Sequence, residues 1–240
     1  MCKACDERLA HGMCGWELSL ARVEEMTEES ASKSTRTRAR VLHAAARAFR
    51  ANGYASTSLK QIADHADMQA GSLYYHFDNK DELVEAVLDE GVQGAQRAAQ
   101  DAVDAIVDAA DPLAKIESAF RGHLAYLLAE ADFAVATLRM LHQVPDAIRV
   151  RHLRKQRAFG RFYAKLFAAA KAQGQIREAF NLSALRMLLL GALNWSPEWY
   201  DAAGLSPDQL VEQLTMMMRS GVMPPQREPI RRRRQTTTKH

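Results

Sequence analysis

The residue types most suited to binding chemistry cluster in the segment GSLYYHFDNKDEL, residues 71–83. Tyrosine hydroxyls, an imidazole and the ammonium group of Lys80 can all donate hydrogen bonds to phosphate oxygens, and such contacts set the register of a protein on DNA. Gln69, just before this segment, has the two-pronged amide that matches an adenine edge. A core helix would use Leu or Ile in place of Tyr75 and His76, so the segment is better suited to binding nucleic acid than to packing in a core.

The rest of the chain carries no signature of an enzyme. It has no His-Glu-x-x-His, no phosphate-binding glycine loop, no nucleophile elbow and no dinucleotide fingerprint. We therefore expect no catalytic residues and no cofactor other than a small-molecule effector. The three cysteines fall within the first fifteen residues, where zinc could use their spacing with His11. The segment has no core and precedes another methionine, Met26, so we interpret residues 1–32 as a disordered extension or an over-called translation start, without a metal site.

The charges are distributed unevenly along the chain. The formal net charge is only +3, yet the stretch 33–60 contains seven Lys or Arg and no acidic residue. A basic segment confined to one end is the electrostatic footprint expected for a polyanion. A solvated, ion-paired face is the alternative, but no acids are interleaved to pair with these bases.

Apolar residues recur at helical spacing after residue 34, which predicts an all-α fold. The first helix is expected from about Thr35 to Asn52, with Gly53 as its stop signal. A second, short helix starts after the N-cap Ser58, and a third spans about residues 69–76. Two short helices joined by a tight turn form a helix-turn-helix, whose second helix enters the DNA major groove.

The faces of the short third helix have different predicted roles. Leu73 and Phe77, at i and i+4, should point into a three-helix core, and Tyr74 should flank Phe77 there. Gly71 should allow a close approach of a neighbouring element. Tyr75 and His76 are left to face outward.

Further helices are expected beyond the helix-turn-helix. Asp78 should cap a helix that reaches about Ala110, and Asp111-Pro112 should begin the next. The remaining helices are predicted at 113–131, 133–143, 146–173, 182–200 and 207–220, with Asn181 and Ser206 as the N-caps of the last two. The predicted organisation is a DNA-binding domain over 33–79, a helical ligand-binding and dimerisation domain over 80–222, and a disordered basic tail over 223–240.

The segment TRARVLHAAARAFRANGYASTSLKQIADHADMQAGSLYYHFDNKDELVEAVL closely resembles the DNA-binding part of TetR/AcrR-type transcriptional regulators. The family usually has Gly where Asp67 stands and Ser or Thr where Gln69 stands, and Asp can adopt the left-handed turn that this Gly provides. The resemblance implies direct DNA contacts, to which we add the N-cap Ser58 and two residues of a basic arm. The predicted DNA-binding set is Arg36, Arg38, Thr57, Ser58, Lys60, Gln69, Ser72, Tyr75, His76 and Lys80.

A looser resemblance covers about residues 185–221. The stretch LLLGALNWSPEWYDAAGLSPDQLVEQLTMMMRSG resembles regulators of fatty-acid or steroid catabolism that acyl-CoA thioesters release from DNA. The apolar group would fill a helical pocket, for which the predicted lining is His123, Tyr126, Leu127, Phe133, Leu138, Met140, Leu141, Arg149, Phe159, Phe162, Tyr163, Leu166, Arg186, Met187, Trp195 and Trp199. The phosphates need cations, which Arg139, Arg149, Arg151, Arg154, Lys155, Arg157 and Arg186 could supply, unless these form a solvated helix face.

The resemblance also implies a homodimer and a palindromic operator of double-stranded DNA. Apolar stripes on the last two predicted helices suit a two-fold interface, which would use Leu185, Leu188, Leu189, Ala192, Leu210, Leu214, Met217 and Met218. A monomer core is the alternative reading of these stripes. The most apolar run, 187–195, is too short to cross a bilayer, and no secretory signal is evident, so we expect a cytoplasmic protein without a membrane partner.

Two other functions fit the same fold. The first is a sensor of hydrophobic cationic drugs that controls an efflux pump, for which Glu117, Glu130 and Asp132 are the candidate acids. The second is an architectural DNA binder without sequence preference, which would use the basic arm and tail. The basis of our preference for an acyl-thioester effector is that arginines outnumber acids near the expected pocket.

Overall fold

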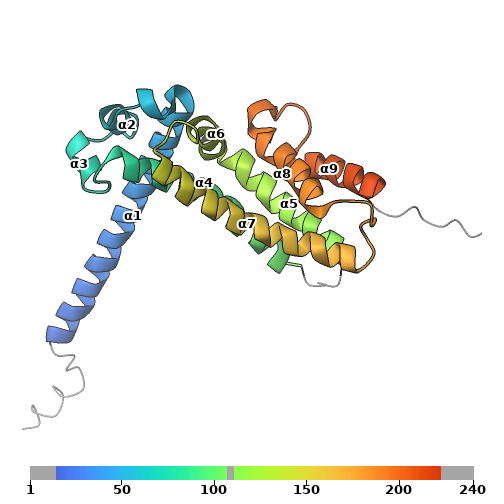
Figure 1. Cartoon of the computed structure of the whole chain (residues 1–240). Coiled ribbons are helices and arrows are strands. Elements are labelled where there is room, and N and C mark those ends of the chain that lie inside the picture. The colour runs from blue at the N-terminus through green and yellow to red at the C-terminus, as the bar shows by residue number, and fades with distance from the viewer. Residues whose placement is uncertain (1–14, 107–110, 223–240) are drawn as a thin grey trace, which may run out of the picture.

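The computed structural model describes residues 15–106 and 111–222, with side chains from Lys33 onward, and every described element is α-helical (Figure 1). The all-α prediction is confirmed. The helices are α1 (Gly15–Ser56), α2 (Leu59–His65), α3 (Ala70–Tyr74), α4 (Lys80–Asp104), α5 (Pro112–Ala129), α6 (Ala131–Met140), α7 (Asp146–Ala172), α8 (Leu182–Trp199) and α9 (Pro207–Val222). Within this described part of the chain, no helix is both long and apolar enough to cross a membrane.

The predictions for the two ends of the chain can be compared with the structure only where residues are described. Residues 1–14 and the predicted basic tail, 223–240, lie outside the described residues. The helix α1 begins at Gly15, so residues 15–32 belong to it, and the predicted helix start near Thr35 is wrong.

Gly53 sets the geometry at the end of α1. Its backbone, at φ 74° and ψ 176°, interrupts the helix in a region of conformational space that is essentially restricted to glycine. The side-chain oxygen of Gln143, in the turn between α6 and α7, accepts a hydrogen bond of 3.0 Å from the Tyr54 N–H. A Cβ atom on Gly53 would lie 2.7 Å from that same oxygen. The kink and the approach of Gln143 therefore both require glycine.

The helix-turn-helix forms as the capping signals predict. The Ser58 hydroxyl accepts a hydrogen bond from the Gln61 N–H, and the Gln61 side chain accepts one from the Ser58 N–H. Asp67 has a φ of 51°, which confirms that it takes the left-handed position between α2 and α3. The helix α3 has five residues, with Gln69 and Tyr75 as its caps, and is shorter than the predicted range 69–76.

The caps of the later helices agree with the sequence except at α4. The cap there is Asn79, whose side-chain oxygen accepts from the Glu82 N–H at 2.9 Å, so the assignment to Asp78 is wrong. The Asp78 N–H instead donates to the Glu82 carboxylate at 2.7 Å, which places Asp78 outside the helix. Asp111, Asn181 and Ser206 cap α5, α8 and α9 as predicted.

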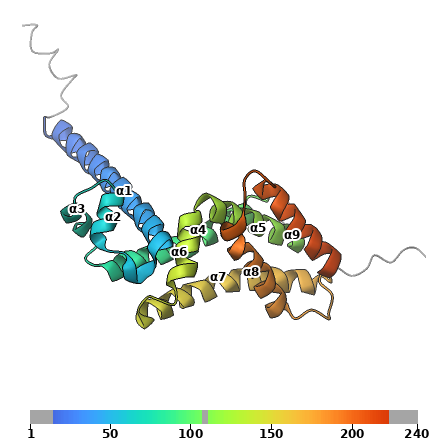
Figure 2. The ribbon, with the colours of Figure 1, turned by 90° about the horizontal axis from the view of Figure 1, so that it is seen from above.

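Two hydrophobic cores lie at opposite ends of the molecule, and α4 runs from one toward the other (Figures 1 and 2). The first core packs α1–α3 against the start of α4 and also contains Phe133, Ala136 and Met140 of α6. The second packs α5, α7, α8 and α9 against the C-terminal half of α4. Because α6 contributes to the first core, residues beyond the predicted domain boundary at 79–80 hold the helix-turn-helix in place.

Two glycines provide a matched test of this geometry. We expect Gly53→Ala to lower the free energy of unfolding by about 1–3 kcal/mol, because alanine is strained at that backbone conformation and collides with Gln143. Gly71→Ala is the control, since its Cβ would meet nothing within 4 Å and its φ is not positive. Thermal and urea unfolding of both variants measure the difference, and equal stability of the two would contradict the assignment.

Candidate DNA interface and ligand cavity

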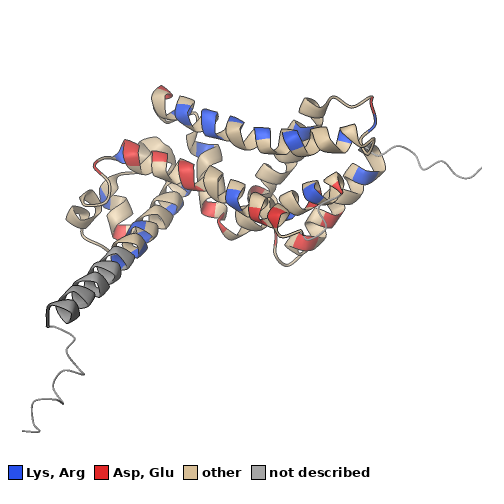
Figure 3. Cartoon of the chain, turned by 90° about the horizontal axis from the view of Figure 1, so that it is seen from below, with Lys and Arg blue, Asp and Glu red and all other residues tan. Residues whose placement is uncertain are grey.

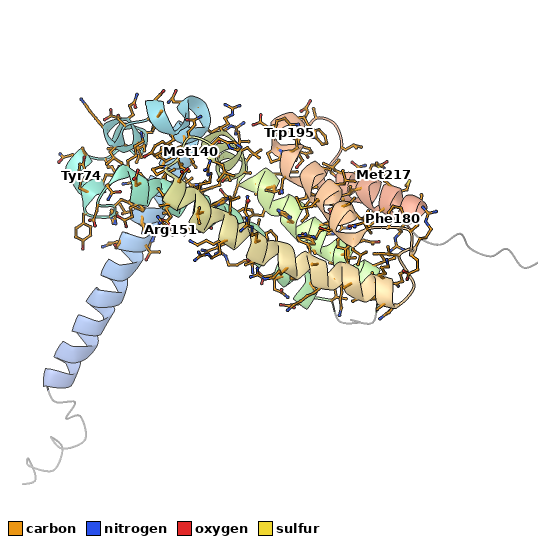
Figure 4. All side chains as sticks on the ribbon, in the orientation of Figure 1. Tyr74, Met140, Arg151, Phe180, Trp195 and Met217 are labelled. Carbon is orange, nitrogen blue, oxygen red and sulfur yellow. The ribbon has the colours of Figure 1, made fainter. Side chains whose placement is uncertain are left out.

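The surface of α3 and the turn after it is aromatic and exposed. Tyr75 is 82% exposed and Tyr74 is 53% exposed, while Leu73 and Phe77 are buried in the first core. The outward position of Tyr75 and the inward positions of Leu73 and Phe77 are confirmed. The expectation that Tyr74 lies in the core is wrong (Figure 4). The helix α3 ends at Tyr74, and Leu73 is the single buried side chain among its five residues.

Most of the predicted DNA-binding residues lie on the same exposed part of the molecule. Arg36, Arg38, Ser58, Lys60, Gln69 and Ser72 are exposed, and His76 and Lys80 are half-buried. The Arg38 guanidinium lies 4.7 Å from the centroid of the Phe77 ring, so the basic arm contacts the turn after α3. The Lys80 ammonium lies 4.2 Å from the centroid of the Tyr54 ring, and burial lowers its pKa.

Tyr54 fixes the position of Lys80. Its hydroxyl donates to the Asp81 carboxylate, and burial together with this hydrogen bond raises the Tyr54 pKa to about 12. Tyr54 is therefore neutral at physiological pH, and its ring remains available to the Lys80 cation.

Thr57 is the exception among the predicted contacts. Its side chain is buried, and its hydroxyl donates to the Gly53 carbonyl at 2.7 Å, with the Ala48 carbonyl 3.3 Å away. The prediction that this side chain binds DNA is wrong, because the hydroxyl closes the turn between α1 and α2.

Gly71 also has a role different from the predicted one. A Cβ atom there would meet nothing within 4 Å, so no neighbouring element of the chain comes close. The absence of a side chain instead leaves space on the exposed side of α3, next to Ser72 and Tyr75.

A cavity of about 250 Å³ lies among α4, α5, α6, α7 and α8. Among its lining residues, Arg186 is the one permanent cation, and no carboxylate is present within the part of the chain that the structure describes. Six predicted residues line it: His123, Leu127, Leu138, Phe159, Arg186 and Met187. The other residues that line the cavity were not predicted from the sequence: Gly91, Val92, Ala95, Ala134, Thr137, His152, Gln156, Gly160, Leu190, Gly191 and Asn194.

Ten predicted ligand residues lie outside this lining. Phe133 and Met140 are buried in the first core, and Tyr163 is buried in the second. Trp195 and Trp199 are more than half exposed on α8. The Tyr126 hydroxyl donates to the Glu90 carbonyl, and Arg149 pairs with Asp146. The other three residues outside the lining are Leu141, Phe162 and Leu166. Aromatic residues at helical spacing thus fill the cores, and the cavity forms where glycines leave space.

Two of the polar lining residues are already hydrogen-bonded. The Tyr163 hydroxyl donates its one hydrogen to the Ala119 carbonyl at 3.1 Å. It must therefore accept a hydrogen bond from the Nδ1–H of His123 at 3.2 Å. Burial lowers the His123 pKa to about 4, so this imidazole is neutral at physiological pH. The Arg186 Nη1 donates to the Gly160 carbonyl at 3.0 Å, and a Cβ on Gly160 would lie 2.7 Å from that nitrogen.

His152 differs from these residues. It is 2% exposed, and neither ring nitrogen has a hydrogen-bond partner among the described residues. Leaving a buried donor or acceptor unpaired costs about 1–3 kcal/mol. Its spacing of four residues from Gln156 and seven from Phe159 on α7 was a signal in the sequence, since the three share one helix face.

Most of the cations proposed for phosphates are paired with acids. Arg151 binds Glu85 through two hydrogen bonds of 2.6 Å, Lys155 binds Asp89, and Arg139 contacts Glu198. Arg154 and Arg157 are exposed and form no ion pair with another described residue. Arg154 and Arg157 are three residues apart on α7, so they share one helix face, and Figure 3 shows Lys and Arg following one another along this helix.

The predicted dimer residues divide into two groups. Leu188 is 74% exposed and Met217 is 72% exposed, and Ala192 is also exposed. Leu185 and Met218 are buried in the second core of their own subunit, so their prediction as interface residues is wrong. Leu189, Leu210 and Leu214 are half-buried against that core. Trp195 and Met217 lie at the end of the molecule opposite Tyr74 (Figure 4).

The chain matches two family models. Residues 41–87 match the model of bacterial regulatory proteins of the tetR family, and residues 109–222 match a tetracyclin repressor-like C-terminal domain. These ranges contain the helix-turn-helix and most of the cavity lining. The chain belongs to the TetR family. TetR proteins are DNA-binding transcription regulators and not enzymes, so the fold and the absence of an enzyme signature agree with the match.

Individual TetR relatives are similar over different lengths. The transcriptional regulator TtgR of Pseudomonas putida is 44% identical over 64 residues, 27% of this chain, and the match spans 30% of TtgR. The transcriptional repressor KstR2 of Mycolicibacterium smegmatis is 25% identical over 203 residues, 82% of this chain and 96% of KstR2.

Two solved structures share the TetR fold. The ketosteroid transcriptional regulator KstR2 of Mycobacterium tuberculosis gives a TM-score of 0.68 at 21% identity, covering 78% of this chain and 95% of its own. AibR, solved with isovaleryl coenzyme A and operator DNA, gives 0.65 at 23% identity, covering 75% and 97%. At these identities the two structures show the fold alone.

The exposed aromatic turn provides the test of the DNA interface. We expect Tyr75→Ala to weaken binding to an operator selected from random duplexes at least about tenfold, which corresponds to about 1.4 kcal/mol. The melting temperature should not fall, because Tyr75 is exposed and outside both cores. Fluorescence anisotropy measures the affinity. His142→Ala, exposed in the turn after α6, is the control, and equal DNA affinity of the two variants would contradict the assignment.

Proposed function

We propose that this protein is a homodimeric, ligand-responsive repressor that binds a palindromic operator. A bulky apolar ligand releases it, and the ligand class we favour is an acyl-CoA thioester of lipid or steroid catabolism. The observation that carries this proposal is the lining of the cavity, which is largely apolar, with neutral polar groups, one permanent cation and no carboxylate among the described residues. Such a lining favours a neutral or anionic ligand and disfavours a cationic drug.

The acids expected for a drug sensor support this choice by their positions. Glu117 pairs with Arg219, Glu130 lies 3.5 Å from His43, and Asp132 pairs with Arg50. None of the three lines the cavity. Two relatives with the same fold agree in kind, since AibR was solved with isovaleryl coenzyme A and KstR2 is a ketosteroid transcriptional regulator.

The exposed apolar face of α8 and α9 supports the homodimer. Leu188, Ala192 and Trp195 follow at intervals of four and three residues, so they form one stripe on α8, and Met216 and Met217 are exposed on α9. Exposed apolar side chains that gather on the last two helices favour this part of the surface as an interaction site. Two-fold pairing through this patch would present two α3 helices to half-sites about 34–36 Å apart.

The helix α6 supports a route from ligand to DNA. Ala134, Thr137 and Leu138 line the cavity, while Phe133 and Met140 of the same helix are buried in the core of the helix-turn-helix. A ligand that displaces α6 therefore also displaces α1. It shifts the equilibrium only by its difference in affinity for the two arrangements, and operator DNA must weaken ligand binding by the same factor.

The effector class is tested with three groups of compounds. We expect acyl-CoA thioesters to raise the melting temperature and to release operator DNA, with a stabilisation of about 2.7 kcal/mol at a hundredfold excess over Kd. Matching free acids should act more weakly, because they lack the phosphates that Arg154 and Arg157 can bind. Hydrophobic quaternary ammonium compounds should have no effect.

Two arginine variants make this test specific. Arg186→Gln should weaken thioester binding, because it removes the cation from the cavity lining. Arg149→Gln is the matched control, since Arg149 lies outside the lining and pairs with Asp146. Release of DNA by the ammonium compounds and not by the thioesters would overturn the effector proposal in favour of a drug sensor.

The dimer is tested by placing a charge on the α8 stripe. We expect Leu188→Asp to convert the protein to a monomer in sedimentation analysis and to weaken operator binding, because a buried unpaired charge opposes association. The melting of the subunit itself should change little, since Leu188 is exposed there. Val150→Asp, on the exposed face of α7, is the control. A Leu188→Asp protein that remains a dimer would refute the interface.

A further inference from the structure

His152 is a buried side chain whose hydrogen-bonding capacity the protein leaves unused. Its ring lines the cavity, and both nitrogens lack a partner among the described residues. Asp89 and Lys155 are the charged groups that influence it, but they bind each other and neither bonds to the ring. Burial lowers the His152 pKa, so the ring is neutral and offers one donor and one acceptor.

A metal ion does not account for His152. Within the described residues there is no group of three His, Cys, Asp or Glu side chains that could hold one. A structural role does not account for it either, because His123 in the same cavity shows what such a role requires, namely a bond to the Tyr163 hydroxyl. The unpaired ring of His152 can therefore bond to a molecule that occupies the cavity.

The positions of His152 and Arg186 define the shape of that molecule. Arg186 donates to the Gly160 carbonyl, and Gly160 follows His152 by eight residues on α7. Eight residues of α-helix rise about 12 Å, so the two polar points lie roughly that far apart along the cavity. Between them the cavity presents apolar groups, among them Phe159, Leu127 and Leu138.

We infer that His152 recognises a hydroxyl or carbonyl oxygen at the end of the effector remote from its acid or thioester group. The effector class is therefore an apolar compound with oxygen at both ends, such as an oxo- or hydroxyacyl derivative, and not a plain alkyl chain. This inference rests on the proposed effector site and adds its polar specificity. A neutral imidazole can donate to a carbonyl or pair with a hydroxyl, so it accepts both groups.

The first experiment needs no ligand. We expect His152→Phe to melt at the same temperature as the wild-type protein or higher, because the change removes unpaired polar atoms and keeps a ring in the cavity wall. His123→Phe, the matched control, should melt lower, because it removes a buried hydrogen bond to Tyr163. His152→Leu guards against a misfit of the larger ring. If both His152 variants melt lower, as His123→Phe does, His152 is structural and the inference is overturned.

The second experiment compares decanoyl-CoA with 10-hydroxydecanoyl-CoA by calorimetry. Wild-type protein should bind the hydroxylated thioester about five- to tenfold more tightly, which is the contribution of one good hydrogen bond. The preference should vanish in His152→Phe and return in part in His152→Gln, which restores a donor and an acceptor.

The outcomes separate this inference from the proposed function. Equal affinity of wild-type protein for both thioesters overturns the role of His152 and leaves the acyl-thioester effector intact. If neither thioester binds, the proposed effector class fails, and the melting temperatures then decide about His152. If the His152 variants keep or raise the melting temperature, His152 serves a different effector that carries oxygen at both ends. If they lower it, His152 is structural and the inference is overturned.

Discussion

The packing of α6 into the core of the helix-turn-helix is the interaction on which the rest of the structure depends. Phe133, Ala136 and Met140 are buried against α1 and the start of α4. The turn that follows α6 reaches the end of α1, where the Gln143 side chain accepts a hydrogen bond from the Tyr54 N–H. A glycine at position 53 is the condition for this contact, because its backbone conformation excludes other residues and its missing side chain makes room for Gln143.

Polar contacts extend this packing on both sides of α6. Arg139 donates to the Arg50 carbonyl of α1 at 2.8 Å and lies 3.6 Å from the Glu198 carboxylate of α8. Asp132, at the start of α6, accepts from Arg50 at 2.9 Å. One helix thus connects the DNA-binding end with the last helices of the second core. The helix α4 also contributes to both cores, and the ion pairs of Glu85 with Arg151 and of Asp89 with Lys155 join it to α7.

The features that the sequence predicted correctly are those that depend on residues close together in the chain. The caps Ser58, Asp111, Asn181 and Ser206 were correct, since each bonds to a backbone N–H two or three residues away. Leu73 and Phe77 were correct because the Phe77 N–H donates to the Leu73 carbonyl at 3.0 Å, so this i, i+4 pair shares a face although α3 ends at Tyr74. Tyr74 and Thr57 were wrong because their environment depends on where a helix stops and on which carbonyls a turn brings near.

The cavity could be predicted only in part for the same reason. Apolar periodicity indicates that Phe133, Met140 and Tyr163 are buried, but it does not indicate which core receives them. The space itself arises where Gly91, Gly160 and Gly191 come together from three helices, and no local pattern encodes that meeting. Arg149 and Arg151 were predicted as phosphate ligands from charge alone, whereas the acids that neutralise Arg151 come from α4, more than sixty residues away.

Some polar groups of the cavity are hydrogen-bonded within the protein and His152 is not, and this difference affects how a ligand is recognised. His123 and Arg186 have partners within the subunit, so a ligand must replace or share those bonds to gain from them. His152 has no such partner among the described residues, so a ligand that bonds to it gains without breaking a bond inside the protein. A protein selected only for stability would fill that position with an apolar residue. His152 lines the same cavity as Ala134, Thr137 and Leu138 of α6, the helix that also packs into the DNA-binding core, so a ligand bound there can favour one arrangement of α6 through its difference in affinity.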